Sequence, residues 1–554
     1  MSTRGRHVGV LEIRGDKMLP NQPSFERRAL NRVTFGGRDL DEKYVQTVGW
    51  AAWVNEQLIG PPDGDDPALA AFIAGQTMHI EYAAAADNSN GNWPAVKEER
   101  TLVTLTASTA DLWSLYAGNG TAVPGNEITR VRQELAAATW IRNSQSKYQL
   151  REFMTDFWHN HFNIGKGSHE TATVELPVYD RDVIRPNVFG NFRNLLQATA
   201  HSTSMMIYLD NWLSRATTPN ENYSREVLEL HTLGADVYLG VINSDPPSIQ
   251  AGPYKVTAGF TDADVTQASR ALSGWTVANG QYVRAGKVLP MTGEFAYDAA
   301  MHNTEAKMFM GVDLSKLTSD MAQGNRVLDI AAYHPATARF ICGKLCTRIF
   351  GEGYPKAVFS RAYDAWMNNQ DAPNQIGMVL RAILLDGTEV GTLPATKLRR
   401  PYEHLIALFR SGDMIVNAGT TMTNAFDPVT DFLFAWTPPN GRPDNNAYWL
   451  TTGALLTVWN NAMTWPANTA IQTTLTAQTP DSAKLTAAAV VEYWVGRMVG
   501  FALSSAAMTT LASDATTANI PALIKAKNPN ATTIENAFRR LVGLIAQSPE
   551  FMYR

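Results

Sequence analysis

Residues 41–58, DEKYVQTVGWAAWVNEQL, show the pattern that most of the chain follows. Apolar side chains recur there at three- and four-residue intervals, which places them on one face of an α-helix. The pattern stops at IGPPDGDDP (59–67), where glycine and proline break a helix. The segment therefore predicts one amphipathic helix followed by a loop.

Similar helical patterns extend over the rest of the chain. They cover 24–37, 128–143, 148–160, 192–214, 221–234, 262–275, 320–335, 336–350, 356–369, 373–386, 483–513, 520–527 and 533–547. Alternating apolar residues and turn residues predict a small β excursion near 276–316, and 415–450 read as irregular polar loops. We expect a mainly α, compact multi-helix body with a polar tail at 1–23. The domain 24–554 is either undivided or split by the excursion into lobes 24–275 and 317–554.

Composition excludes several classes of protein. The chain of 554 residues is 45% apolar and 18% charged, with a net charge of −5, which gives no basic face for nucleic acid. The longest apolar tract, 485–508, contains Glu492 and Arg497, so it predicts a buried helix and not a membrane span. Two cysteines, Cys342 and Cys346, are too few for a disulfide framework or a Cys-rich zinc site. The polar first residues show no secretory signal, which favours the cytoplasm.

The stretch FWHNHFN (157–163) carries two histidines two positions apart, His159 and His161. In extended backbone both imidazoles would lie on one face and could bind one metal ion. In a helix they would diverge by about 200° and could not. A helix that ends near Trp158 and continues as extended chain fits the pattern. The alternative is that each histidine donates to a buried carbonyl and packs among the neighbouring aromatic rings.

The stretch NENYSREVLELH (220–231) predicts a helix with two carboxylates, Glu226 and Glu229, on overlapping faces. Helical carboxylates combined with histidines from another element are how helical folds build metal sites. The alternative is an ordinary ion pair between Arg225 and Glu229, four positions apart. Glu226 lies among apolar residues, and a buried carboxylate needs a partner. His231, near the helix end, is explained well enough as a cation that the helix dipole favours.

Further candidates lie on loops and helix starts. His302 on a predicted loop is either a ligand or general acid/base, or a surface hydrogen-bonding group. Asp262 is the expected N-cap of the next helix, whereas Asp264 either caps it or faces a cleft. Arg270 binds an anion or pairs with a neighbour. Capping or ion pairing is the default for the remaining residues, which are His334, Arg399 and Arg400.

Several segments resemble, in order, a bacterial family catalogued as domain of unknown function 1800. They are RALNRVTFGG, FWHNHFN, YLDNW, NENYSREVLELHTLG, DVTQASRALSGWT, HNTEAKMFMG, HPATARFICGKLC, LRRPYEHLIALFRSGD and LVGLIAQSPEF, which span about 25–551. The resemblance implies a mostly helical fold, export in many relatives, and often a companion protein similar to sulfatases and alkaline phosphatases. It implies no known reaction.

This chain departs from the family's pattern at two places. His302 is followed by Asn303 where the family usually has aspartate, and PPNGRPDNNAYW (438–449) lacks the usual Gly-Trp-Pro step. If that aspartate were a ligand or a base, this chain would lack it.

Two functions follow from these motifs. The first is a metal-dependent and preferably hydrolytic enzyme acting on an unknown substrate, with His159, His161 and Glu226 as metal ligands. Glu226, His302 and Asp264 would be its catalytic residues, and mixed N/O ligands suit zinc, iron, manganese or copper. The preference for hydrolysis rests on the phosphatase-like or sulfatase-like companion. Nucleotide-binding and serine-hydrolase motifs are missing.

The second is a non-catalytic structural or accessory protein of the cell envelope, whose polar motifs are buried packing networks. The two functions differ in geometry. The enzyme requires the His159, His161 and Glu226 side chains to share one solvent-reachable pocket. The structural reading has them dispersed or sealed by protein partners.

Overall fold

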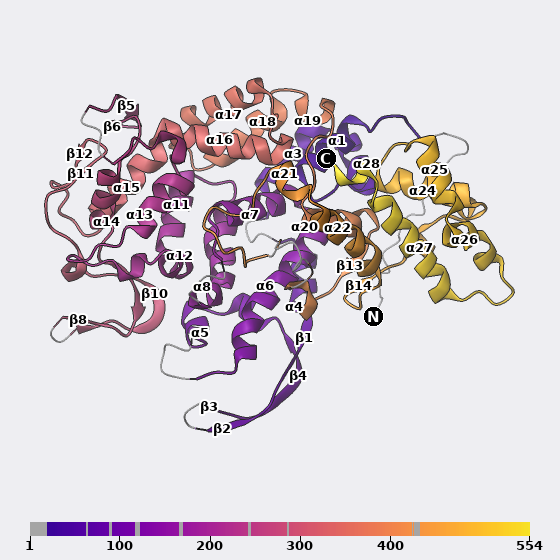
Figure 1. The fold of residues 1–554 in the computed structure, drawn as a ribbon, viewed down its shortest axis with the longest axis horizontal. Coiled ribbons are helices and arrows are strands. Elements are labelled where there is room, and N and C mark those ends of the chain that lie inside the picture. Colours follow the sequence, from indigo (N-terminus) through magenta and orange to yellow (C-terminus); the bar gives the residue numbers. More distant parts are fainter. Residues whose placement is uncertain are drawn as a thin grey trace. The chain divides into compact units, whose positions relative to one another are not determined.

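The computed structural model describes residues 19–61, 65–87, 91–116, 122–165, 170–241, 245–284, 287–423, 425, 431 and 433–554. Helices predominate in these ranges, and the paired strands form small two-stranded antiparallel sheets (Figure 1). The predicted mainly α fold is therefore confirmed.

The described chain divides into two compact units, whose boundaries differ from those of the expected lobes. Unit 1 takes its residues from Met1–Val48, Gly391–Val416 and Thr452–Arg554, and unit 2 from Gly49–Val390 and Asn417–Thr451. The short helix α19 (Glu389–Thr392) spans one boundary. Each unit thus combines segments that are distant in the sequence.

In unit 1, the helix α27 (Ala531–Ala546) packs against most of the other helices. Its buried Ile534, Phe538, Leu541 and Ile545 recur at helical spacing, so one face enters the core. The elements of this unit are α1 (Phe25–Val33), α2 (Asp39–Val48), α20 (Pro401–Ser411), β13 (Ile415–Val416), α22 (Thr452–Thr464), η10 (Trp465–Ala467), β14 (Ile471–Gln472), α23 (Leu475–Gln478), η11 (Asp481–Lys484), α24 (Ala487–Met498), α25 (Ser505–Ser513), α26 (Ala515–Lys525), α27 and α28 (Pro549–Met552).

In unit 2, helices surround the buried helix α7 (Gln149–His161). The other helices are α3 (Trp50–Ile59), α4 (Pro67–Ala74), η1 (Val103–Thr106), α5 (Thr109–Trp113), α6 (Gly125–Gln145), α8 (Glu170–Val174), α9 (Leu176–Val178), η3 (Tyr179–Ile184), α10 (Arg185–Asn187), α11 (Phe192–His201), α12 (Thr203–Tyr208), η4 (Asn211–Leu213), α13 (Asn222–Glu226), η5 (Val227–His231), η6 (Ala235–Val237), α14 (Asp262–Ala271), η7 (Ala299–Met301), α15 (Ala322–Tyr333), α16 (Pro335–Phe350), α17 (Lys356–Asn368), α18 (Gln375–Leu385), η8 (Thr420–Thr423) and α21 (Asn446–Trp449). Two of these segments, η3 and η5, are π-helical.

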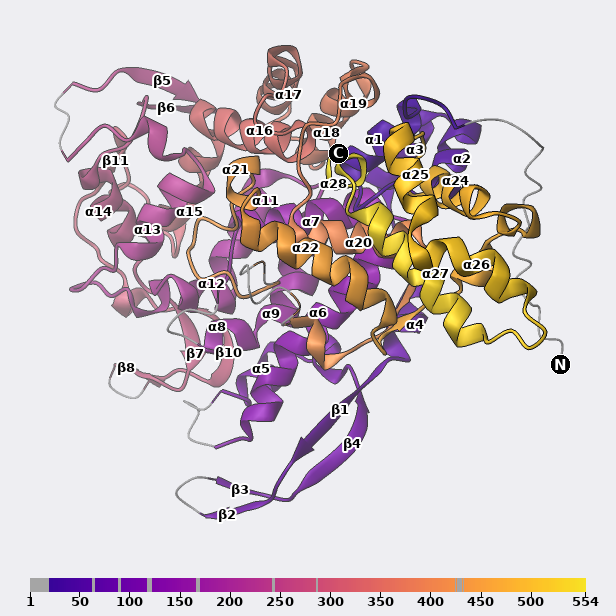
Figure 2. The same cartoon turned by 45° about the vertical axis from the view of Figure 1, so that its right-hand side comes forward.

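The strands of unit 2 confirm the predicted β excursion and add hairpins outside it. The strands within the excursion are β7 (Trp275–Asn279), β8 (Tyr282–Arg284), β9 (Lys287–Val288), β10 (Met291–Tyr297), β11 (Met308–Phe309) and β12 (Val312–Asp313). Those outside it are β1 (Thr77–Tyr82), β2 (Ala85–Asp87), β3 (Gly91–Trp93), β4 (Val96–Thr101), β5 (Ser248–Ala251) and β6 (Tyr254–Thr257). The ribbon of β1 to β4 projects from the helices of this unit (Figure 2). Met78 and Ile80 alternate with exposed residues along β1, which makes it a half-buried strand.

The helix predicted over 41–58 is in fact two helices, because α2 ends at Val48 and α3 begins at Trp50. Gly49 between them has φ 87°, a left-handed backbone angle that favours glycine. The boundary between the two units lies at the same place. Periodicity alone could not reveal the break, since the apolar spacing continues through it.

The start of α14 differs from the prediction by one residue. The N-cap of α14 is Thr261, and Asp262 is the first helical residue, so the prediction of an Asp262 cap was wrong. Cys342 and Cys346 are free cysteines buried in α16. None of the helices in the described ranges combines the length and apolar character needed to cross a bilayer.

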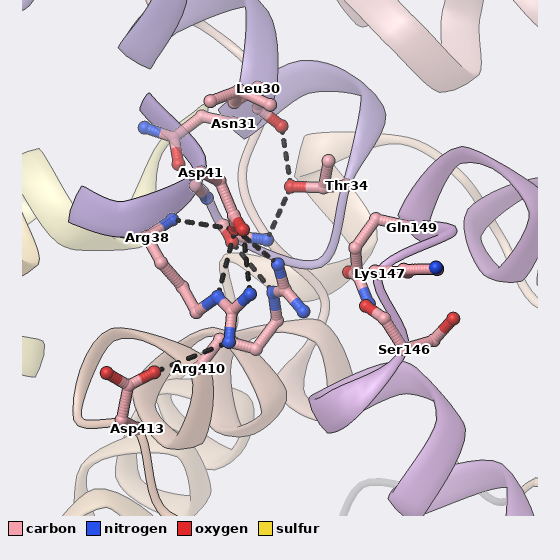
Figure 3. Close-up of polar contacts among 12 residues, drawn as sticks. Leu30, Asn31, Thr34, Arg38, Asp41, Ser146, Lys147, Gln149, Arg410 and Asp413 are labelled. Atoms are coloured by element: carbon pink, nitrogen blue, oxygen red, sulfur yellow. Dashed lines mark hydrogen bonds and ion pairs between the residues drawn. The ribbon is translucent and has the colours of Figure 1, made fainter. Parts of the chain in front are cut away.

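A charged cluster ties α2 to α20 within unit 1 (Figure 3). The Asp41 carboxylate accepts from Arg38 Nη2 at 2.7 Å and from Arg410 Nη2 at 2.7 Å. Arg410 also donates through Nε to the Gly36 carbonyl at 2.8 Å, and Arg38 pairs with Asp413 at 3.4 Å. Burial pushes the pKa of Asp41 upward, but the charges of Arg410 and Arg38 hold it below its usual value.

The Asp41→Ala variant is expected to lose about 2 kcal/mol of unfolding free energy, because it removes a carboxylate that the buried Arg410 guanidinium faces. The estimate lies below that for a fully buried pair because the Asp41 side chain is 18% exposed. Urea unfolding measures the loss. The matched control is Asp481→Ala, whose pair with Lys484 is exposed on the carboxylate side and is expected to contribute less than about 0.5 kcal/mol. Equal losses in both variants would contradict this account.

Candidate functional site

The FWHNHFN histidines lie on one continuous helix. Helix α7 runs through His161 and is capped by Phe162, so the expectation of a helix ending near Trp158 was wrong. Two positions along a helix correspond to about 200° of rotation. His159 and His161 therefore leave the helix on different sides and contact different groups, and they do not face one common ion.

His159 belongs to a buried charge network that sequence analysis did not foresee. Its Nε2 lies 2.8 Å from Asp180 Oδ1, on the π-helical segment η3. Asp180 Oδ2 accepts from Arg185 Nε at 2.8 Å, and Arg185 donates to both Glu152 oxygens at 3.1 and 2.9 Å. Burial alone would raise the pKa of Asp180, but Arg185, His159 and Arg142 hold it well below its usual value. Asp180 therefore stays ionised and fixes the imidazole.

A second network begins one turn earlier on α7, at Asp156. Its two oxygens accept from Arg348 Nη2 at 2.9 Å and from Arg442 Nη2 at 2.7 Å. Arg442 also pairs with Asp431 at 3.1 Å, and its backbone N–H donates to Asn160 Oδ1 at 2.7 Å. Asp156 thus joins α7 to α16 and to the loop around 431–442, and its charge is compensated on both sides.

His161 is sealed by protein partners on both ring nitrogens. Its Nε2 donates to the carbonyl oxygen of His231 at 3.0 Å, and its Nδ1 accepts from Lys344 Nζ at 3.0 Å. Burial, then the charge of Lys344, holds the pKa of His161 well below its usual value. Burial also lowers the pKa of Lys344 to about 8, against the charge of Asp444. His161 is therefore a neutral bridge between α7, α16 and the end of the Glu226 segment.

The structure changes the interpretation of His231. Burial and then Lys344 lower its pKa to about 3, so the imidazole is neutral and the expected cation at the helix end was wrong. Its ring nitrogens have no hydrogen-bond partner within the described ranges. Its backbone carbonyl oxygen accepts the hydrogen bond from His161 Nε2.

Glu226 ends α13, just before the π-helical η5, and is half-buried. Burial and then the charge of Glu229 raise its pKa to about 6, against Arg225. Among the described residues no hydrogen bond or ion pair to its carboxyl group is seen. Glu229 instead pairs with Arg225 at 3.3 Å, as the ordinary interpretation expected. Glu226 is thus a carboxyl group whose pKa lies near neutrality, and neither FWHNHFN histidine pairs with it.

Asp264 and His302 are both held by neighbouring groups. Asp264 forms a capping box with Thr261, and its Oδ1 accepts from the Met310 N–H at 2.7 Å. His302 Nδ1 lies 2.8 Å from the Ser273 carbonyl oxygen, and Nε2 lies 3.2 Å from Gln323 Oε1. The geometry thus supplies a structural partner for every polar atom of these side chains that was expected to do chemistry.

Asn303 uses its amide in a way that an aspartate could not. Its Nδ2 donates to the Ala216 carbonyl at 2.9 Å, while its Oδ1 accepts from Arg270 Nε at 3.3 Å. Arg270 also pairs with Glu305, so it is a paired cation and not an open anion site.

Two of the three helix-start candidates, His334 and Arg400, adopt the expected roles of capping and ion pairing, whereas Arg399 contacts backbone carbonyls. His334 Nδ1 caps α16 by accepting from the Ala336 N–H at 3.0 Å. Arg400 pairs with Glu403 at 3.0 Å, and Arg399 donates to backbone carbonyls of the final residues.

A small polar cavity of about 20 Å³ separates the two α7 networks. Its lining includes His159, Asp180, Asp156, Arg442 and Phe434. That volume suffices for about one water molecule. Nowhere in the described part of the chain do three His, Cys, Asp or Glu side chains gather closely enough to hold a metal ion.

The groups that sequence analysis missed become visible only through tertiary contacts. Asp180, Arg185 and Arg442 lie in unremarkable polar stretches, and only the fold brings them to α7. Lys344 gave a weak signal, as a lone charge in the apolar run ICGKLC.

Comparison with known sequences identifies the family of the chain. The sequence profile described as protein of unknown function (DUF1800) matches residues 28–553, almost the whole chain. No curated protein and no solved structure matches the chain. The resemblance of the motifs is therefore confirmed at the level of the family, and this chain belongs to the DUF1800 family.

Proposed function

We propose that this protein is a non-catalytic structural or accessory protein. One observation carries the proposal: each FWHNHFN histidine is held by a different protein group on a different side of α7. A buried polar network whose members are satisfied fixes a unique packing, and losing one member is costly. Under this proposal, His159 and His161 lock α7 to its neighbours.

The metal content of the purified protein tests this proposal. We expect no stoichiometric zinc, iron, manganese or copper by plasma mass spectrometry, in the unmodified protein or after reconstitution. His159→Ala and Glu226→Ala should leave that result unchanged. The matched control is His79→Ala, which removes an exposed histidine of β1. Near-stoichiometric metal that is lost in both variants, with circular dichroism intact, would contradict the proposal and support the metal-dependent enzyme.

A second candidate, an acid–base enzyme, is favoured by Glu226 specifically. A catalytic acid or base works best with a pKa near the working pH, and the pKa of Glu226 is about 6. Burial raises the pKa of the Tyr208 phenol to about 12, and the nearby charge of Glu226 is a smaller contribution in the same direction. Perturbed groups gather at active sites, although structural networks perturb them too.

A further inference from the structure

A separate cavity in unit 2 contains a buried carboxyl group without a partner. The cavity measures about 250 Å³ and is lined by residues of α5, α9, η3, α11, α12 and β10. Glu175 lines it at the start of α9 and is 2% exposed. Within the described residues neither of its carboxyl oxygens has a hydrogen-bond partner. An unpaired buried carboxyl group is costly, so its presence beside an open volume points to a missing partner.

The remaining lining defines the chemistry of that partner. The buried Ser204 hydroxyl also lacks a partner among the described residues, and Glu294 adds an exposed second carboxylate. None of the described residues that line the cavity is a lysine or an arginine. The His201 and Phe295 rings stack with their centroids 4.0 Å apart and offer aromatic surface. Burial and then Arg193 lower the pKa of His201 to about 4, so this imidazole adds no positive charge.

We propose that this cavity binds a small organic amine, whose ammonium group pairs with Glu175 and whose apolar part lies against Phe295 and His201. An ammonium group donates to a carboxylate in a charge-assisted hydrogen bond, and aromatic faces attract cations. Burial raises the pKa of Glu175 to about 9, against the charge of Arg181, so the empty site holds a neutral carboxyl group near pH 7. Formation of the ion pair therefore releases one proton to solvent. The site is independent of the proposed accessory function.

Benzylamine is a suitable probe, with benzyl alcohol and benzoate as its neutral and anionic counterparts. Isothermal titration calorimetry of the full chain at pH 7 should show saturable binding of benzylamine at one site. Titration in two buffers of different ionisation enthalpy should report release of about one proton per site, which follows from a neutral carboxyl group becoming ionised. Benzyl alcohol and benzoate should bind at least about tenfold more weakly, since neither supplies a cation.

Two variants locate the site. Glu175→Gln keeps the size of the side chain and removes its ability to ionise, so benzylamine affinity should fall by at least about tenfold. Glu99→Gln, at an exposed position outside the cavity lining, should change the affinity less than about threefold. Circular dichroism checks that both variants fold. No saturable benzylamine binding, unchanged binding in Glu175→Gln, or tighter binding of benzyl alcohol or benzoate would each overturn the proposal.

Discussion

The Glu175→Gln variant is expected to be more stable than the unmodified protein at neutral pH, by about 3 kcal/mol at pH 7. Burial raises the pKa of Glu175 from 4.5 in a free chain to about 9 in the fold. A raised pKa contributes stability that is fully present below pH 4.5 and is lost as the pH rises through 9. The unmodified protein therefore loses about 1.4 kcal/mol per pH unit across that window. Glutamine does not titrate and escapes the loss.

Urea unfolding at a series of pH values, without amine, measures this difference. The difference in unfolding free energy between the variant and the unmodified protein should increase steadily from about pH 5 to pH 9 and vanish near pH 4. Glu99→Gln serves as the control, because it removes a carboxylate at an exposed position outside the cavity lining. A gap that is independent of pH would show that Glu175 does not keep its proton in the fold.

The Asp156→Ala variant is expected to lose about 3–5 kcal/mol of unfolding free energy, the cost of leaving buried charges without their partner. Asp156 holds two guanidinium groups, those of Arg348 and Arg442, whose side chains are 2% and 6% exposed. Arg442 keeps Asp431 at 3.1 Å, and Arg348 keeps Asp444 at 4.0 Å. Urea unfolding followed by tryptophan fluorescence measures the loss.

Two further variants separate charge from packing at Asp156. Asp156→Asn retains the size of the side chain and one acceptor oxygen. Its unfolding free energy should therefore lie between those of Asp156→Ala and the unmodified protein. Asp182→Ala removes an exposed partner of Arg181 and is expected to cost less than about 1 kcal/mol. A loss below about 1 kcal/mol in Asp156→Ala would mean that water replaces the carboxylate, and the network would then not be a packing element.

The helical fold could be predicted because its signal is local. Apolar spacing, and caps such as His334 before Pro335, identify helices without tertiary information. The break at Gly49 was not predicted because the apolar spacing continues through it, and only the backbone angle φ of 87° reveals it. The pairing of β1 with β4 was not predicted because only two apolar residues, Met78 and Ile80, lie on its buried face.

The candidate site could be predicted only in part. The FWHNHFN and Glu226 segments do meet, where His161 donates to the His231 carbonyl. The direction in which each histidine side chain points depended on whether α7 continued to His161. The sequence pattern could not decide this last turn of the helix. Glu175 was not among the candidates from the sequence, although it is a lone carboxylate in the apolar run TATVELPVY. Only the fold shows that its oxygens have no partner among the described residues. Pairing is a property of the fold, since it joins residues distant in the chain.

The divided course of unit 1 has a consequence for how the chain is made. Helix α1 lies against the far end of the chain, where Arg554 Nη1 donates to the Arg32 carbonyl at 2.7 Å. A ribosome therefore releases α1 and α2 first and their partners last. At about 5–20 residues per second, the intervening chain takes roughly 25–100 s to synthesise. For that interval, the apolar faces of the first helices are exposed substrates for chaperones, while unit 2 can already begin to fold.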